Sequence, residues 1–308
     1  MAATPSGTIK FSDIKVLMPG TFTIFGLSNI RNFNLNSPQY GIIKISNFRN
    51  QYLFPTINSP MSSIGGCYSV RLINATYTGP VFQLRRSSDN VLQTFYTDDK
   101  QSYITSGANN TGTSFASWIT TNTAYVYVWY DQSSYSVNCS NTTNSTQPAI
   151  IKLTNNFYSI NFSSNLGNVV TLSSGVLPKA IFCHFYNTNT TRGTILSAKT
   201  IDYKVAFGAV TASLIVGGST PTDWYYSSTG TKLAYNNGAV STNVLVGAWN
   251  LLSLSATTPT NSAQLSLIGH DGVNGNVSSL NGYMIDMILY INSVIASDII
   301  AYYNNKLF

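Results

Sequence analysis

Charged residues make up only 8% of this 308-residue chain, against about 25% in an average soluble domain. All ten acidic residues are aspartates, and helix surfaces normally use Glu heavily, so the composition disfavours a helical protein. The net charge of +6 contains no run of Lys or Arg, which argues against a nucleic-acid partner. The opening residues lack the apolar core of a signal peptide, and no stretch is long and apolar enough for a transmembrane helix, so no membrane insertion is expected.

Residues 1–65 differ from the rest of the chain. They hold five of the ten prolines and repeat a short motif as FSDIK (11–15), LSNIR (27–31) and ISNFR (45–49). Ser followed by Asp or Asn is typical of capped turns. This segment is either an irregular extended stretch or an N-terminal arm that docks on neighbouring subunits, and we expect the arm. Its candidate contact residues are Phe11, Ile14, Leu27, Ile30, Ile45 and Phe48.

Residues 66–308 alternate between strand patterns and turns. VFQLRR (81–86), the turn SSDN and VLQTFY (91–96) predict a β-hairpin, and TAYVYVWY (123–130) predicts a further strand. Segments such as AIFCHFY, WNLLSLSA and GYMIDMILYI continue the series, separated by Asn, Gly, Ser and Thr. So many short strands at regular spacing predict an all-β sandwich. Ser297 followed by DIIAYYNNKLF predicts a short C-terminal helix with an N-cap.

Two stretches of this second region carry the motifs of a known family. CYSVRLINATYTGPVFQLRRSSDNVLQTF (67–95) and VYVWYDQSS (126–134) resemble the catalytic domain of arabinofuranosidase B and a wider group of similar domains in phage and large-virus proteins. The matching residues are Tyr68, Ser69, Arg71, Tyr77, Thr78, Gly79, Arg85, Arg86, Ser87, Ser88, Asp89, Tyr130, Asp131, Gln132 and Ser133. The chain departs from the family pattern at Ser134, where the family has glycine, and by one inserted residue at Ala75–Thr76.

The resemblance implies a concanavalin A-like β-sandwich, or jelly roll, for residues 66–308. It also implies a glycosidase with a glutamate nucleophile, and a retaining glycosidase needs two carboxyl groups about 5 Å apart. This chain has no glutamate, and the shorter Asp side chain would misplace the attacking oxygen. We therefore expect a protein that is not an enzyme.

No cofactor or metal is expected, because no metal-binding spacing is present. The chain has three cysteines, Cys67, Cys139 and Cys183. Their number allows either one disulfide with a free thiol or three free thiols, and nothing in their spacing decides between the two.

Arg85, Arg86 and Asp89 lie close together in the predicted hairpin, and Asp131 ends a different strand. A charge that is buried in so uncharged a chain needs a partner. We favour a structural role, in which one arginine forms a bidentate pair with Asp131 or Asp89 and holds the hairpin and the YDQSS turn together.

The alternative for the same region is functional. Trp129, Tyr130, Asp131 and Gln132 would then form a sugar pocket, in which rings stack on the sugar and polar groups bind its hydroxyls.

The opening GTIKFSDI (7–14) also resembles the openings of phage and large-virus structural proteins. We therefore expect a virion structural protein, made in the host cytoplasm, that contacts itself or other virion proteins and can attach to host glycans. The alternatives are a glycan-binding lectin-like domain and, less favoured, an active arabinofuranosidase-type glycosidase.

Overall fold

A computed structural model describes residues 63–74, 76–97, 104–107, 112–153, 158–188, 193–199, 204–207, 231–236, 239–241, 244–255, 264–272 and 279–291. These residues form β-strands, two short 3-10 helices and one short α-helix, so the predicted all-β class is confirmed. The apolar arm residues from Phe11 to Phe48 and the helix predicted after Ser297 lie outside the described residues. No helix in the described ranges is long and apolar enough to cross a membrane.

The first strands are β1 (Ile64–Ser69), β2 (Phe82–Arg86), β3 (Leu92–Thr97), β4 (Ile104–Thr105), β5 (Ala124–Trp129), β6 (Cys139–Ser140), β7 (Ala149–Lys152) and β8 (Tyr158–Phe162). They are followed by β9 (Val170–Val176), β10 (Ala180–Asn187), β11 (Gly193–Ser197), β12 (Lys204–Phe207), β13 (Thr231–Asn236), β14 (Ala239–Ser241), β15 (Ala248–Ser255), β16 (Leu265–Ile268) and β17 (Gly282–Tyr290). The helices are α3 (Phe115–Ile119), η4 (Asn144–Thr146) and η5 (Ser164–Leu166). β1 begins two residues before the predicted start of the sandwich.

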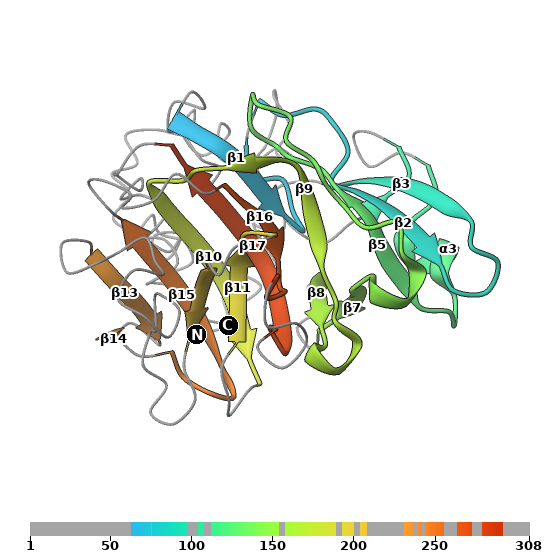
Figure 1. Ribbon diagram of the computed structural model, residues 1–308. Helices are drawn as coiled ribbons and strands as arrows, with labels where there is room; N and C mark the ends of the chain where they lie inside the picture. The colour runs from blue at the N-terminus through green and yellow to red at the C-terminus, as the bar shows by residue number, and fades with distance from the viewer. Residues whose placement is uncertain are drawn as a thin grey trace, which may run out of the picture. The chain divides into compact units, whose positions relative to one another are not determined.

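The long strand β17 lies at the centre of one layer. It pairs with β10 along its whole length, and on its other edge with β1 and β8. β10 continues to β15, which pairs with β13, and β13 pairs with β14. All of these pairings are antiparallel, and Figure 1 shows β10, β15 and β17 side by side.

The sheet branches at β5. Near its start β5 pairs with β7, which leads through β8 to β17. Near its end β5 pairs with β6, which leads through β9 and β16 to β11 and β12. The other edge of β5 pairs with β2, and the predicted hairpin of β2 and β3 is confirmed there. The result is a strongly curled antiparallel sheet that closes over one core.

Close packing of strands from the two branches is seen at Gly269, which follows β16. A Cβ atom at this position would lie 2.2 Å from the ring of Phe162 on β8, and the φ angle of Gly269 is +81°. Only glycine fits here, because the space is occupied and the backbone is left-handed. Alternate residues of β10 fill the core between the branches, where Ile181, Cys183 and Phe185 are buried.

The helix α3 covers the end of the hairpin (Figure 1). The hydroxyl of Ser114 accepts a hydrogen bond from the N–H of Ser117 at 3.1 Å, which caps the first turn. Phe115 and Trp118 are the buried residues of the helix, and their rings lie 5.6 and 5.2 Å from the ring of Phe95 on β3. Aromatic packing therefore fixes α3 on the hairpin.

Candidate functional site

Arg86 and Asp89 form the bidentate pair of the hairpin turn. The Nε of Arg86 donates to Oδ1 of Asp89 at 3.0 Å, and its Nη2 donates to Oδ2 at 2.6 Å. The Nη1 of Arg86 donates to the carbonyl of Trp118 at 2.8 Å, and the guanidinium lies 5.1 Å from the ring of Trp118. The hydrogen bond from Arg86 lowers the pKa of the Asp89 carboxyl. The pair therefore fastens the turn to α3.

Arg85 lies on the other face of the strand and is buried among neutral partners. Its Nε donates to Oε1 of Gln147 at 2.6 Å, and its Nη1 donates to Oδ1 of Asn90 at 2.8 Å. The guanidinium also lies 4.8 Å from the centre of the Tyr125 ring on β5, opposite Arg85 in register. Arg85 thus joins the hairpin to β5 and to the segment before β7.

Asp131 is held by backbone and hydroxyl donors rather than by an arginine. Its Oδ1 accepts from the N–H of Cys67 at 2.7 Å and of Ser133 at 2.8 Å. Its Oδ2 accepts from the hydroxyl of Ser133 at 2.6 Å and from the N–H of Val137 at 2.9 Å. Burial raises the pKa of the Asp131 carboxyl, and these hydrogen bonds oppose that rise. Of the two partners predicted for an arginine, Asp89 is the one that the structure shows.

Gln132 completes the same junction. Its N–H donates to the carbonyl of Cys67 at 2.7 Å, and its Nε2 donates to the carbonyl of Arg71 at 2.7 Å. Its Oε1 accepts from the N–H of Ile73 at 2.9 Å, and its carbonyl accepts from Nδ2 of Asn74 at 2.7 Å. The turn after β5 is therefore bonded to β1 and to the residues that follow it.

The predicted sugar pocket is not open to a sugar at most of its residues. Trp129 is fully buried, its Nε1 donates to the carbonyl of Ser69 at 3.0 Å, and its ring lies 6.1 Å from that of Phe82. Asp131 and Gln132 are also buried. Tyr130 alone among the four keeps part of its surface exposed. A ring inside the core has no face left for stacking on a sugar.

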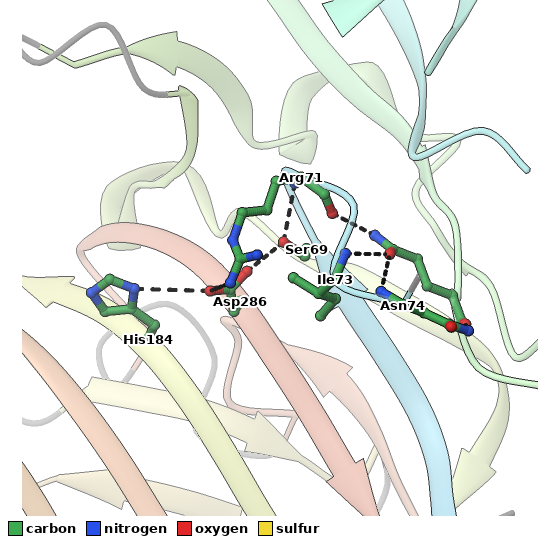
Figure 2. A network of polar contacts seen from close by, with 7 residues as sticks. Ser69, Arg71, Ile73, Asn74, His184 and Asp286 are labelled. Carbon is green, nitrogen blue, oxygen red and sulfur yellow. Dashed lines mark hydrogen bonds and ion pairs between the residues drawn. The ribbon is translucent and has the colours of Figure 1, made fainter. Parts of the chain in front are cut away.

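Four buried polar residues form a charged cluster on the neighbouring strands, shown in Figure 2. Asp286 lies on β17, opposite Ser69 on β1 and His184 on β10. The hydroxyl of Ser69 donates to Oδ1 of Asp286. Oδ2 of Asp286 lies 4.0 Å from Nη2 of Arg71 and 3.9 Å from Nδ1 of His184. A charge in this apolar sheet is thus surrounded by donors.

The chemistry of this cluster is electrostatic rather than nucleophilic. In a Ser–His–Asp triad the serine bonds to the histidine, whereas here Ser69 bonds to Asp286. Burial lowers the pKa of His184 to about 4, and Arg71 acts in the same direction while Asp286 opposes it. His184 is therefore neutral at pH 7, and Asp286 is paired with the permanently charged Arg71.

The described residues contain no group of three or more His, Cys, Asp or Glu side chains that could hold a metal ion. Cys67, Cys139 and Cys183 are free and buried, which decides between the two arrangements that the sequence left open. Burial raises the pKa of all three thiols, so they are unreactive as nucleophiles.

Sequence reasoning missed Asp286 and His184 as members of one cluster. A signal was present, because each is a polar residue in the middle of a strongly apolar strand, GYMIDMILY and AIFCHFYN. A charge in such a strand requires a partner. Which partner it has depends on the register of three strands that are far apart in the chain.

No family model matches the sequence, and no curated protein matches it. Solved structures that resemble this one include an arabinofuranosidase complexed with arabinofuranosyl-α-1,2-xylobiose and a GH54 α-L-arabinofuranosidase soaked with a cyclic sulfate inhibitor. Each has 13% sequence identity and a TM-score of 0.48, over 78% of this chain and 62% of the other. The chain thus spans less than two thirds of those enzymes. An identity this low carries no information about activity.

The hydrogen bonds of Asp131 predict a stability effect. Asp131→Asn places an amide N–H₂ against N–H donors, so it should lower the free energy of unfolding by about 3 kcal/mol. Asp89→Asn, at an exposed pair, should melt close to the parent and is the matched control. Urea unfolding of the three proteins measures the difference, and equal stability of Asp131→Asn and the parent would contradict the structural role of Asp131.

The buried His184 predicts a loss of stability in mild acid. The pKa of His184 in the folded protein, about 4, lies below the ordinary value of 6.5. The neutral form of His184 therefore contributes fully to the free energy of unfolding above pH 6.5, and this contribution is lost as the pH falls toward 4. The difference between these pKa values corresponds to about 3 kcal/mol. When urea unfolding is measured between pH 6.5 and 4.5, the free energy of unfolding should fall more steeply with pH in the parent and in His270→Gln than in His184→Gln. Equal slopes in all three would rule out this role.

Proposed function

We propose that this chain is a structural protein of a virus particle, built on an arabinofuranosidase-like sandwich that does not hydrolyse glycosides. The proposal rests on the hydrogen-bond partners of the motif residues. Arg86, Asp89, Asp131 and Gln132 all bond to other parts of the same fold. The motif that carries the resemblance therefore serves folding, and the likeness does not bring an active site with it.

The carboxylates of the chain support the absence of hydrolysis. The sequence contains no glutamate. Of the aspartates in the described residues, Asp131, Asp271 and Asp286 are buried, and Asp89 is paired with Arg86. A retaining mechanism needs two carboxyl groups that face the substrate about 5 Å apart, and these aspartates do not offer such a pair.

The assembly role is supported by the rest of the sequence. The opening GTIKFSDI resembles viral structural proteins, and the proline-rich segment 1–65 has the composition of an arm that needs a partner. The low charge of the chain leaves a neutral surface that can pack against other copies or other virion proteins. The proposed location is the particle, after synthesis in the host cytoplasm.

Because the aspartates of the described residues offer no pair of substrate-facing carboxyl groups and the sequence has no glutamate, we expect the purified chain to have no glycosidase activity. Incubation with aryl α-L-arabinofuranosides and related substrates, followed by release of the aryl group, should show no turnover above a blank. The opposite outcome would be turnover that is lost in Asp286→Asn and kept in Asp89→Asn, and it would establish an active glycosidase.

The arm predicts an assembly defect on truncation. Because β1 begins at Ile64, a chain of residues 61–308 keeps every described strand. It should remain folded and soluble but should no longer form the oligomer of the full chain, as measured by light scattering after size-exclusion chromatography. A truncated chain that aggregates, beside a full chain that is a stable monomer, would mean that residues 1–60 pack on their own sandwich.

A further inference from the structure

Arg85 on β2 is a buried cation that the protein itself does not neutralise. It is only 7% exposed. Within the described residues no carboxylate pairs with Arg85, whereas the more exposed Arg86 next to it pairs with Asp89. Burying a charge is costly unless an opposite charge compensates it. The arginine that needs a counter-charge more is therefore the one that lacks it.

The hydrogen bonds of Arg85 leave part of its guanidinium unused. Its Nε donates to Gln147 and its Nη1 to Asn90, and its Nη2 lies 3.4 Å from the carbonyl of Asn144, which is long for a hydrogen bond. A guanidinium has five N–H groups. One N–H of Nη1 and one N–H of Nη2 therefore have no partner within the protein. Two N–H groups on these atoms match the two oxygens of a carboxylate.

The Nη atoms of Arg85 lie nearer to solvent than its Nε. The bond from Nε to Gln147 is buried, while the bonds from Nη1 and Nη2 are only partly buried. Asn90 and Asn144, which accept those two bonds, are exposed residues of the hairpin turn and of η4. A ligand can therefore approach the Nη atoms from the solvent side, where these two asparagines lie. The Gln147 side chain holds the guanidinium in position from within, because its own Nε2 is bonded to the carbonyl of Asn141 at 2.6 Å.

The groups around the Nη atoms suit a ligand that also carries hydroxyl groups. The Nδ2 amides of Asn90 and Asn144 make no hydrogen bond within the protein, so they are available to donate to hydroxyl oxygens. Leu92 on β3 lies opposite Arg85 in register, and its side chain is 41% exposed. Residues directly opposite in an antiparallel pair share one face of the sheet, so Leu92 offers an apolar surface beside the cation.

We propose that Arg85 binds the carboxylate of an acidic sugar. The carboxylate would supply the counter-charge that the fold lacks and would accept from Nη1 and Nη2 together. The amides of Asn90 and Asn144 would bind the sugar hydroxyls, and Leu92 would pack against the C–H groups of the ring. A sugar combines these three kinds of group in one small molecule. The inference goes beyond the proposed assembly role and does not rest on it, because it depends on Arg85 and its neighbours.

Two sugars that differ only in the charged group test the proposal. Methyl β-D-glucuronide has a carboxylate where methyl β-D-glucoside has a hydroxymethyl group. In titration calorimetry with the full chain, the glucuronide should bind and the glucoside should bind more weakly by about tenfold or more. Sodium acetate supplies the carboxylate without the sugar and should also bind more weakly than the glucuronide. Acetate that binds as tightly as the glucuronide would assign the site to any small carboxylate and would overturn the proposal of a sugar.

The deciding variant is Asn90→Asp, because replacement of the buried Arg85 puts the fold at risk. Asp keeps an acceptor on Nη1 and tolerates the left-handed backbone of position 90, where φ is +59°. It also gives Arg85 a counter-charge within the protein. Asn90→Asp should therefore bind methyl β-D-glucuronide more weakly than the parent by about tenfold or more. Thermal melting of the variant shows that it is folded.

Gln264→Glu is the matched control. It exchanges an amide for a carboxylate at an exposed residue before β16, so it changes the net charge by the same amount on another part of the sheet. This variant should bind the glucuronide as the parent does. The proposal is overturned if the parent binds neither sugar or binds both equally. It is also overturned if Asn90→Asp and Gln264→Glu bind the glucuronide alike.

Discussion

A buried carboxylate joins the two parts of the curled sheet. Asp131 follows β5, and it accepts hydrogen bonds from Cys67 of β1 and from Ser133 and Val137 of its own loop. β1 in turn pairs with β17, the central strand of the other part. A buried carboxylate is stable only when its lone pairs are filled, so the position of each donor is fixed by the same charge. The geometry of the β5–β1 junction, and with it the course of the chain between Cys67 and Asn74, depends on this group.

The same rule governs the charged cluster on β1, β10 and β17. Asp286 lies within apolar strands and is stabilised by Ser69 and Arg71, while His184 beside it stays neutral. Asp286 and Arg71 are both buried and carry opposite charges, so they offset one another inside the sheet.

In the described residues, Arg85, Asp131 and Asp286 are buried inside the fold and Arg86 is paired with Asp89, whereas Lys152 and Lys199 are exposed. Exposed aliphatic side chains, among them Val91, Leu92, Leu245 and Val246, are available for apolar contacts on the described part of the surface. Contacts of this kind depend on shape and apolar burial rather than on ion pairs, so salt screens them little.

The sequence alone determined the elements that local pattern controls. Alternation and turn residues located the hairpin of β2 and β3, the strand that became β5 and the all-β class, because side-chain period and turn chemistry act over a few residues.

Tertiary structure decided what depends on distant partners. The side of β5 that is buried places Trp129 in the core. Asp131 is held by the N–H of Cys67 on β1 instead of by an arginine, whereas Arg86 pairs with Asp89 in its own turn. Asp286 and His184 meet only because β10 and β17 pair in one register, although they stand about a hundred residues apart in the chain. Such pairings arise from packing of the whole sheet, and no short stretch of sequence contains them.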